Sequence, residues 1–142
     1  MTGLNNYTNR DGVLNRLKRE YLEHGKIIIA FDFDNTIYDY HNHDLDLEAT
    51  ICALRKAYKL GMELFCFTAN SNHQLITDVV EHLLGIPYQD QKINCCSLDH
   101  LFKGRKPFYS ILLDDRAGLD STLRTLHQFM FFVEETSRQN AQ

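Results

Sequence analysis

An apolar run that ends in two closely spaced aspartates constrains the fold of this chain more than any other feature. Residues 27–31 read Ile-Ile-Ile-Ala-Phe, and Asp32, Asp34 and Thr36 follow directly. A run without polar alternation is typical of a strand buried on both faces of a parallel sheet. Open α/β sheets bind their ligands at the carboxyl ends of such strands. We therefore expect both carboxylates to lie at a ligand-binding edge of a sheet.

Strand and helix patterns alternate along the rest of the chain. Apolar runs predict strands at 62–67 and 108–113, and a short strand is expected at 92–95. Apolar residues at three- and four-residue steps predict helices at 11–23, 45–60, 73–84 and 119–133. This alternation predicts a three-layer α/β/α, Rossmann-like architecture with a parallel sheet covered on both sides.

The length of 142 residues fits one domain. We expect residues 11–134 to form it, residues 1–10 to be a flexible arm, and residues 135–142 to be a polar, disordered tail. The aromatic residues near the end of the last helix also fit a strand. They are Phe129, Phe131 and Phe132.

Charge and composition exclude several classes of protein. The net charge of −4 gives no basic footprint for long nucleic acids. No stretch reaches the roughly 18 apolar residues of a membrane span, and the polar start of the chain lacks the apolar core of a secretory signal. The cysteines form no Cys-x-x-Cys pair, which favours reduced thiols and a cytoplasmic protein. They are Cys52, Cys66, Cys95 and Cys96.

Polar, reactive residues follow three of the predicted strands. The first strand ends in the aspartate pair, the second in residues 68–70, and the last in Asp114 and Asp115. Four carboxylates at one sheet edge would repel one another unless a cation neutralised them. Oxygen ligands without histidine or cysteine suggest Mg²⁺, which also accepts a phosphate oxygen of a substrate.

With these residues in this order, the chain resembles the haloacid-dehalogenase-like (HAD-like) phosphatase superfamily. The segment Asp32-Phe33-Asp34-Asn35-Thr36 fits its Asp-x-Asp-x-Thr signature, and Thr68 at a strand end fits the second motif. Lys106 fits the third motif, and the pair Asp114-Asp115 fits the fourth. The resemblance spans residues 26–127 and implies a HAD-like fold and the hydrolysis of phosphoric monoesters.

The resemblance implies roles for the acidic residues. Asp32 would attack phosphorus and form an aspartyl-phosphate. Asp34 would protonate the leaving oxygen and then activate the attacking water. Mg²⁺ would contact Asp32 and the backbone carbonyl of Asp34, with Asp115 as the main further ligand. Asp114 would bind the metal too or orient Asp115.

The resemblance also implies a phosphate site. Thr68, with backbone N–H groups of Ala69 and Asn70, would hold the phosphoryl oxygens, although Asn70 replaces an arginine common in the family. Lys106 would offset the negative charge, because Lys106-Pro107 precedes the last strand as in small capless members. Two other lysines compete for this role, Lys103 and Lys92.

His41 and His43 follow the aspartates, where this superfamily places a flap. They would then contact the leaving group and set substrate specificity. A zinc site is a weaker interpretation because no third ligand lies nearby, and a plain polar loop is a further alternative.

Each motif also has a plainer interpretation. The aspartate pairs would cap turns or helices, Thr68 would bond to the backbone, and Lys106 would be solvated. The order of all four motifs favours the catalytic interpretation.

The gaps between the motifs leave no room for a folded cap domain. Segments 35–67 and 69–105 each hold little more than one helix. Caps exclude water from small substrates, so we expect an open site. The candidate substrates are nucleotides, sugar phosphates and the phosphorylated end of a nucleic acid. The acidic net charge disfavours the last of these. An oligomeric partner is an alternative cover, and the three phenylalanines of 129–132 suit either such a contact or the core.

Two other functional classes compete with the hydrolase. A non-catalytic binding or regulatory module would keep the same scaffold, but such modules usually lose one aspartate of the first motif. A receiver-like phosphoacceptor domain would carry its phosphorylated aspartate on a later strand and would not need Asp34.

Overall fold

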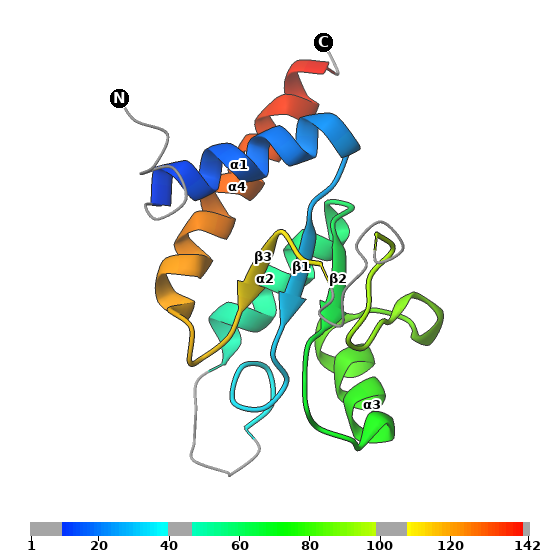
Figure 1. The fold of residues 1–142 in the computed structure, drawn as a ribbon. Helices are drawn as coiled ribbons and strands as arrows, with labels where there is room; N and C mark the ends of the chain where they lie inside the picture. Colours follow the sequence, from blue (N-terminus) through cyan, green and yellow to red (C-terminus); the bar gives the residue numbers. More distant parts are fainter. Residues whose placement is uncertain (1–9, 40–46, 99–107, 141–142) are drawn as a thin grey trace.

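The computed structural model describes residues 10–39, 47–98 and 108–140, and its centre is a parallel sheet (Figure 1). The strands are β1 (Ile28–Phe31), β2 (Glu63–Cys66) and β3 (Ile111–Leu113). Within the described ranges the strand order is β2-β1-β3, and β1 pairs parallel with both neighbours. The predicted α/β class, with a parallel sheet built on the first apolar run, is therefore confirmed.

The first three helices have nearly the residue ranges that were predicted. In the described residues they are α1 (Arg10–His24), α2 (Glu48–Lys59), α3 (His73–Leu84) and α4 (Leu119–Asn140). The side chain of Asn72 caps α3 by accepting a hydrogen bond from the Leu75 N–H, and the helix ends at Gly85 with a φ of 71°. A left-handed glycine is a common helix terminator because it lacks a Cβ. Local capping signals thus set the limits of α3.

The end of α4 differs from the prediction. The helix continues to Asn140, so the residues from Glu135 onward that the structure describes are helical and do not form a disordered tail. An ion pair of 2.8 Å between Arg138 and Glu135 spans one turn of this extension. The strand interpretation of the phenylalanines is also wrong. Phe129 is fully buried in α4, and Phe131 on the same helix is 63 % exposed.

The short strand expected at 92–95 is reduced to a single bridge. Ile93 pairs with Cys66, the last residue of β2. Asn94 has a positive φ of 57°, and this left-handed backbone ends the extended conformation after one residue. Residues 1–9 of the expected arm lie outside the described residues, and its last residue, Arg10, is the first residue of α1.

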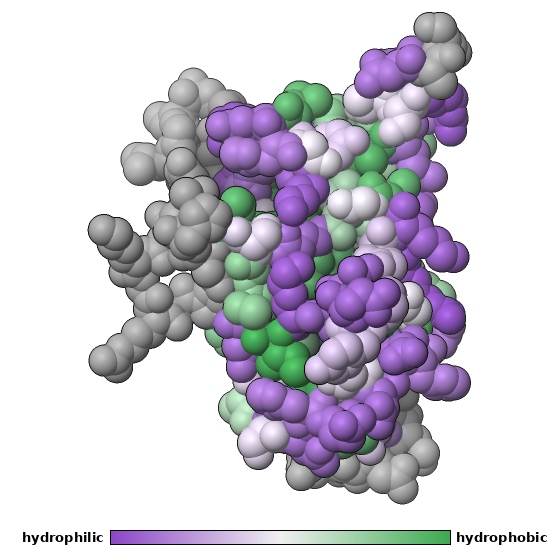
Figure 2. All heavy atoms as spheres, turned by 90° about the vertical axis from the view of Figure 1, so that its right-hand side faces the viewer, coloured by the Kyte–Doolittle hydropathy of each residue, from purple (hydrophilic) through white to green (hydrophobic). Residues whose placement is uncertain are grey.

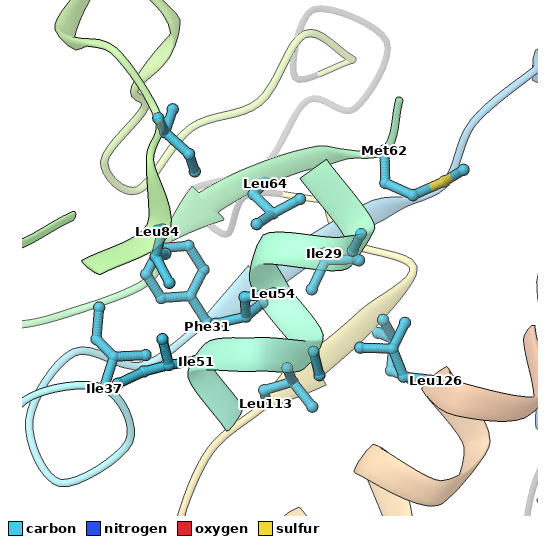
Figure 3. Close-up of a cluster of buried hydrophobic side chains, with 14 of the residues drawn as sticks. Ile29, Phe31, Ile37, Ile51, Leu54, Met62, Leu64, Leu84, Leu113 and Leu126 are labelled. Carbon is cyan, nitrogen blue, oxygen red and sulfur yellow. The ribbon is translucent and has the colours of Figure 1, made fainter. Parts of the chain in front are cut away.

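Alternate residues of β1 face two different clusters of buried side chains. Ile29 and Phe31 pack in a large core with side chains from all the described helices, and Figure 3 shows Leu54 of α2 and Leu126 of α4 among them. Ile28 belongs to a second cluster, to which no described helix contributes. The other members or neighbours of this second cluster are Ala30, Phe65, Phe67, Cys96, Leu98, Phe108, Tyr109 and Leu112.

The second cluster bears on the predicted three-layer architecture. The described part of the chain between α3 and β3 contains one short 3₁₀ turn, Tyr88–Asp90, and otherwise irregular backbone. Irregular segments around Leu98 and Phe108, in place of a helix, therefore cover this face in the described residues. The structure supports helices packed on one face of the sheet within those ranges.

A buried glutamate anchors the irregular segment to the start of β2. Glu63 has a side chain only 6 % exposed, and it lies 2.7 Å from the Lys26 Nζ and 3.7 Å from the Lys92 Nζ. It also accepts a hydrogen bond of 2.8 Å from the backbone N–H of Ser97. Burial raises the pKa of Glu63, but these hydrogen bonds and the charge of Lys92 outweigh it and hold the pKa below its usual value. The carboxylate thus ties the segment 92–97 to the sheet.

The surface around α3 is mainly hydrophilic where the structure describes it (Figure 2). None of the helices in the described ranges combines the length and the apolar character needed to cross a membrane. The cysteines, all of which lie in those ranges, form no disulfide. Cys66 and Cys96 are buried, whereas Cys52 and Cys95 are exposed.

Candidate active site

The strand order brings the first and last motifs together. In the sheet, β2 lies next to one edge of β1, and β3, which comes later in the chain, lies next to the other edge. The carboxyl ends of β1 and β3 therefore adjoin at the point where the order reverses (Figure 1). The backbone N–H of Asp32 donates to the carbonyl of Leu113 at 2.9 Å, which extends the pairing to the first catalytic candidate. Such a switch point is where open α/β sheets bind ligands.

Three of the predicted acidic residues form one cluster. Asp32, Asp114 and Asp115 each offer a carboxylate oxygen, and these oxygens all lie within 4.8 Å of one another. A hollow of about 320 Å³ opens beside them. Its lining consists of Asp32, Asp34, Asn35, Thr68, Ala69, Asp114, Asp115 and Arg116.

The crowding of carboxylates raises their affinity for protons. Burial, together with the charge of Asp114, raises the pKa of Asp32 from 3.8 to about 6. Burial and the adjacent carboxylate of Asp114 also raise the pKa of Asp115. The protein alone therefore leaves this cluster with more negative charge than its surroundings stabilise. A proton or a cation would relieve that repulsion.

A tight loop after β1 shapes one wall of the hollow. The carbonyl of Phe33 accepts hydrogen bonds from the backbone N–H groups of Ile37 and Tyr38, at 3.2 and 3.1 Å. The rings of Phe33 and Tyr38 stack with centroids 5.1 Å apart. Asn35 takes a left-handed φ of 61° at the bend. Asparagine tolerates this backbone better than most residues, which explains its place in the motif.

The donor atoms around the hollow fit a hard divalent cation. The side-chain oxygen Oδ1 of Asn35 is buried and has no hydrogen-bond partner among the described residues. Buried polar atoms are rarely left unsatisfied, so this oxygen indicates room for a ligand or water that donates to it. The carboxylates and the amide oxygen of Asn35 are oxygen ligands, the type that Mg²⁺ prefers. Asp32, Asp114 and Asp115 are the residues that would hold the ion.

The loop after β2 provides polar groups opposite the aspartates. Thr68 is buried, and its hydroxyl accepts the backbone N–H of Asn70 at 3.0 Å. The side-chain Nδ2 of Asn70 donates to Oδ1 of Asp34 at 3.3 Å. Asn70 was predicted to hold phosphoryl oxygens through its N–H, but that group is already engaged by Thr68. In this structure, its amide side chain instead holds Asp34.

The last motif does not cap the following helix. Asp114 accepts the backbone N–H of Arg116 at 3.0 Å within a turn, and α4 begins only at Leu119. The alternative interpretation of this pair as an N-cap of that helix is therefore wrong. The side chain of Asp115 is exposed at the rim of the hollow, beside Arg116.

Several predicted site residues lie outside the described ranges. These are Lys103, Lys106, His41 and His43. Lys92, the third lysine considered, pairs with Glu63 at the amino end of β2, away from the aspartates that follow the carboxyl end of β1. It does not line the hollow.

Two asparagines of the site were missed by sequence reasoning. Asn35 was noted only as a variable position of the first motif, and Asn94 lay in an expected short strand. Both have positive φ values, of 61° and 57°. The sequence signal that could have found them is an asparagine at the end of an apolar run, because asparagine is enriched in left-handed backbone.

No family model matches the chain, and no curated protein or solved structure matches it significantly. The motif order and the geometry around Asp32 are therefore the observations that bear on function.

Proposed function

We propose that this protein is a Mg²⁺-dependent phosphomonoester hydrolase of the HAD-like type, acting through an aspartyl-phosphate on Asp32. The observation that carries this proposal is the convergence of Asp32 with Asp114 and Asp115, whose oxygens lie within 4.8 Å of one another. The two segments are far apart in the sequence but end adjacent strands of the sheet. Structural ion pairs would not explain this cluster, because it joins like charges.

Asp32 would act as the nucleophile. One of its carboxylate oxygens forms a bond to phosphorus while the bond between phosphorus and the leaving oxygen breaks. The carboxylate must be ionised to attack, so the raised pKa of the metal-free cluster calls for a compensating cation. Bound Mg²⁺ would supply positive charge to the carboxylates and the phosphoryl oxygens.

Asp34 would act as the acid and then as the base. It gives a proton to the leaving oxygen in the first step. In the second step it takes a proton from the water that attacks the aspartyl-phosphate, which releases inorganic phosphate and regenerates Asp32. Its Oδ1 accepts the amide hydrogen of Asn70, which fixes the carboxyl plane and leaves Oδ2 for proton transfer.

The phosphoryl oxygens would be held by the loop after β2. Thr68 and Ala69 line the hollow beside Asp32. Arg116 lines the same hollow and is the cation within the described residues that stands nearest in sequence to the acidic cluster. Lys106 remains our proposal for the charge-balancing lysine, with Lys103 as its competitor.

The proposed substrates are phosphomonoesters that an open site admits. The polar lining of the hollow suits a phosphate group better than an apolar ligand. Nucleotides and sugar phosphates are the first classes to test, and a phosphorylated nucleic-acid end is disfavoured by the net charge of −4. A non-catalytic module that binds Mg²⁺ and phosphate is the alternative function.

Hydrolysis of p-nitrophenyl phosphate with and without Mg²⁺ tests the proposal. We expect Mg²⁺-dependent release of nitrophenol, abolished in Asp32→Asn. Asp78→Asn is a matched control, because Asp78 is a helical aspartate of α3 whose contact is Gln74. Equal activity of Asp32→Asn and wild type would exclude Asp32 as the nucleophile. Binding of Mg²⁺ without turnover of a broad panel of phosphomonoesters would favour the non-catalytic module.

A further inference from the structure

The side chain of Asn94 holds both backbone groups of Thr68. Its Oδ1 accepts the Thr68 N–H at 2.8 Å, and its Nδ2 donates to the Thr68 carbonyl at 2.8 Å. The two residues are separated by the whole of α3 in the sequence. An amide that meets an N–H and a carbonyl in this way replaces the pairing that a neighbouring strand would give.

Thr68 needs such a partner because it lies just beyond the sheet. The N–H of Phe67 still donates to the carbonyl of Phe31 at 2.8 Å, and β2 has ended at Cys66. Thr68 itself is buried, and a buried peptide group without a partner is costly. Asn94 therefore extends the hydrogen bonding beyond the end of β2 to Thr68 and fixes where Thr68 lies.

Asn94 is itself held from both sides. Its backbone N–H donates to the carbonyl of Cys66 at 2.8 Å. Three residues later, the N–H of Ser97 donates to the buried carboxylate of Glu63. The positive φ of Asn94 turns the chain between these two anchors. The clamp on Thr68 is thus attached to the sheet and does not depend on a free loop.

Hydrogen bonds continue from Thr68 to the proposed acid. The hydroxyl of Thr68 accepts the Asn70 N–H at 3.0 Å, and the Asn70 amide donates to Asp34 at 3.3 Å. A shift of Thr68 would therefore move Asn70 and loosen the contact with Asp34. The same shift would move Thr68 away from its place beside the proposed phosphoryl site.

We propose that Asn94 is a positioning residue of this site, which acts through Thr68 and Asn70 to orient Asp34. The inference rests on the proposed function for its catalytic meaning. Asparagine is suited to the task because one short side chain supplies a donor and an acceptor and tolerates left-handed backbone. Aspartate would lack the donor, and alanine would lack both groups.

The test compares Asn94→Gly with Gln91→Ala. Glycine keeps the left-handed backbone and adds no charge, while it removes both bonds to Thr68. Gln91 is a matched control, because its Nε2 clamps the carbonyls of Thr77 and Ile86, outside the proposed site. Asn94→Asp is a second variant that keeps the acceptor for the Thr68 N–H and loses the donor. Urea unfolding first confirms that each variant is folded.

Two esters separate positioning of the acid from general loss of structure. Phenyl phosphate has a poor leaving group and depends on Asp34 more than p-nitrophenyl phosphate does. In Asn94→Gly we expect kcat/KM for phenyl phosphate to fall about 10-fold or more, because small misplacements of reacting groups carry large costs. The fall for p-nitrophenyl phosphate should be several-fold smaller. Gln91→Ala should leave the ratio of the two esters unchanged.

Nuclear magnetic resonance gives a readout that does not need activity. The side-chain amide of Asn70 is assigned by its absence from the spectrum of Asn70→Ala. We expect its ¹H–¹⁵N signals to move in Asn94→Gly and to stay in place in Gln91→Ala.

The outcomes distinguish the two proposals. If wild type is active and Asn94→Gly matches Gln91→Ala in both readouts, the inference about Asn94 is overturned while the hydrolase stands. If wild type turns over neither these esters nor the broad panel of phosphomonoesters, the proposed function fails. Unmoved Asn70 signals in Asn94→Gly would overturn the linkage whether or not wild type is active.

Discussion

The hydroxyl oxygen of Thr36 accepts a hydrogen bond of 3.2 Å from the backbone N–H of Asp115. This bond joins the first motif to the last across the adjoining ends of β1 and β3. Thr36 is fully buried and Asp115 is exposed, so the bond lies between the core and the rim of the hollow. The position of the Asp115 backbone therefore depends on a residue that itself contributes no carboxylate to the cluster.

Replacing Thr36 by valine should weaken both the fold and the metal site. Valine keeps the shape but removes the acceptor of the Asp115 N–H, at a cost of about 0.5–1.5 kcal/mol, the net contribution of a typical hydrogen bond. Thr36→Ser keeps the hydroxyl and should retain Mg²⁺ affinity. Urea unfolding and Mg²⁺ titration by calorimetry measure the two effects.

Thr125→Val is the matched control for this experiment. Thr125 is also buried, and its hydroxyl donates to the Ser121 carbonyl within α4. The Thr125→Val substitution should lower the free energy of unfolding without changing Mg²⁺ affinity. Equal Mg²⁺ affinities in Thr36→Val and wild type would argue against a role for Thr36 in holding the last motif.

The raised pKa of Asp32 predicts how pH affects the metal-free protein. In the folded protein the Asp32 carboxyl keeps its proton up to about pH 6, whereas in the unfolded chain it loses the proton near pH 3.8. The free energy of unfolding should therefore fall as pH rises through this window and level off above it. Mg²⁺ should then raise the melting temperature more at pH 8 than at pH 5. Equal Mg²⁺-induced shifts at the two pH values would contradict this.

Neutralising Asp114 should stabilise the metal-free protein. After burial, its charge is the largest cause that raises the pKa of Asp32. At pH 8 we expect Asp114→Asn to melt at a higher temperature than wild type when Mg²⁺ is removed with chelator. Its Mg²⁺ affinity should fall, and that of Asp115→Asn should fall further, by about 10-fold or more, because Asp114 already accepts the Arg116 N–H. A lower melting temperature of chelated Asp114→Asn would contradict the proposed repulsion.

Glu63→Gln should destabilise the fold by about 2 kcal/mol, the scale of hydrogen bonds to a charged group. The lowered pKa of Glu63 means that its contribution is present above its ordinary value of 4.5 and is lost as pH falls through the folded value. The variant should therefore lose less stability than wild type on acidification. Glu134→Gln breaks an exposed pair with Lys56 and should cost roughly 0.5 kcal/mol or less. Urea unfolding at pH 7 and pH 4 measures both variants.

Truncation of two phenylalanines of α4 should change stability by very different amounts. Phe129 is fully buried against Tyr21 of α1, with ring centroids 5.7 Å apart. Phe129→Ala should cost about 3–5 kcal/mol. Phe131 is 63 % exposed, and Phe131→Ala should change stability by about 0.5 kcal/mol or less. A large loss in Phe131→Ala would instead indicate that a second molecule covers this position.

The sequence allowed the sheet and the acidic cluster to be predicted because both follow from short-range patterns. The apolar run before Asp32 indicated a central strand, and that strand is β1. The run before Asp114 indicated a second strand, and parallel pairing then brings the two carboxyl ends together. Thr68 was placed correctly beside the aspartates for the same reason.

The amide contacts of the site were not predictable in the same way. The bonds of Asn94 to Thr68 and of Asn70 to Asp34 depend on the backbone of irregular segments. A single left-handed residue redirects such a segment, as Asn94 does directly after the bridge between Ile93 and β2. The length of α4 was underestimated because its last turns are polar, and composition alone does not distinguish a solvated helix end from a tail.

Trapping of the phosphoenzyme tests the central claim most directly. Asp34→Asn should still form the aspartyl-phosphate from p-nitrophenyl phosphate, whose leaving group needs little protonation, but should hydrolyse it slowly. Mass spectrometry after rapid acid quench should then show one phosphoryl group on the peptide that contains Asp32. The modification should be absent without Mg²⁺ and absent in Asp32→Asn/Asp34→Asn. A phosphoryl group located on a residue other than Asp32 would contradict the account.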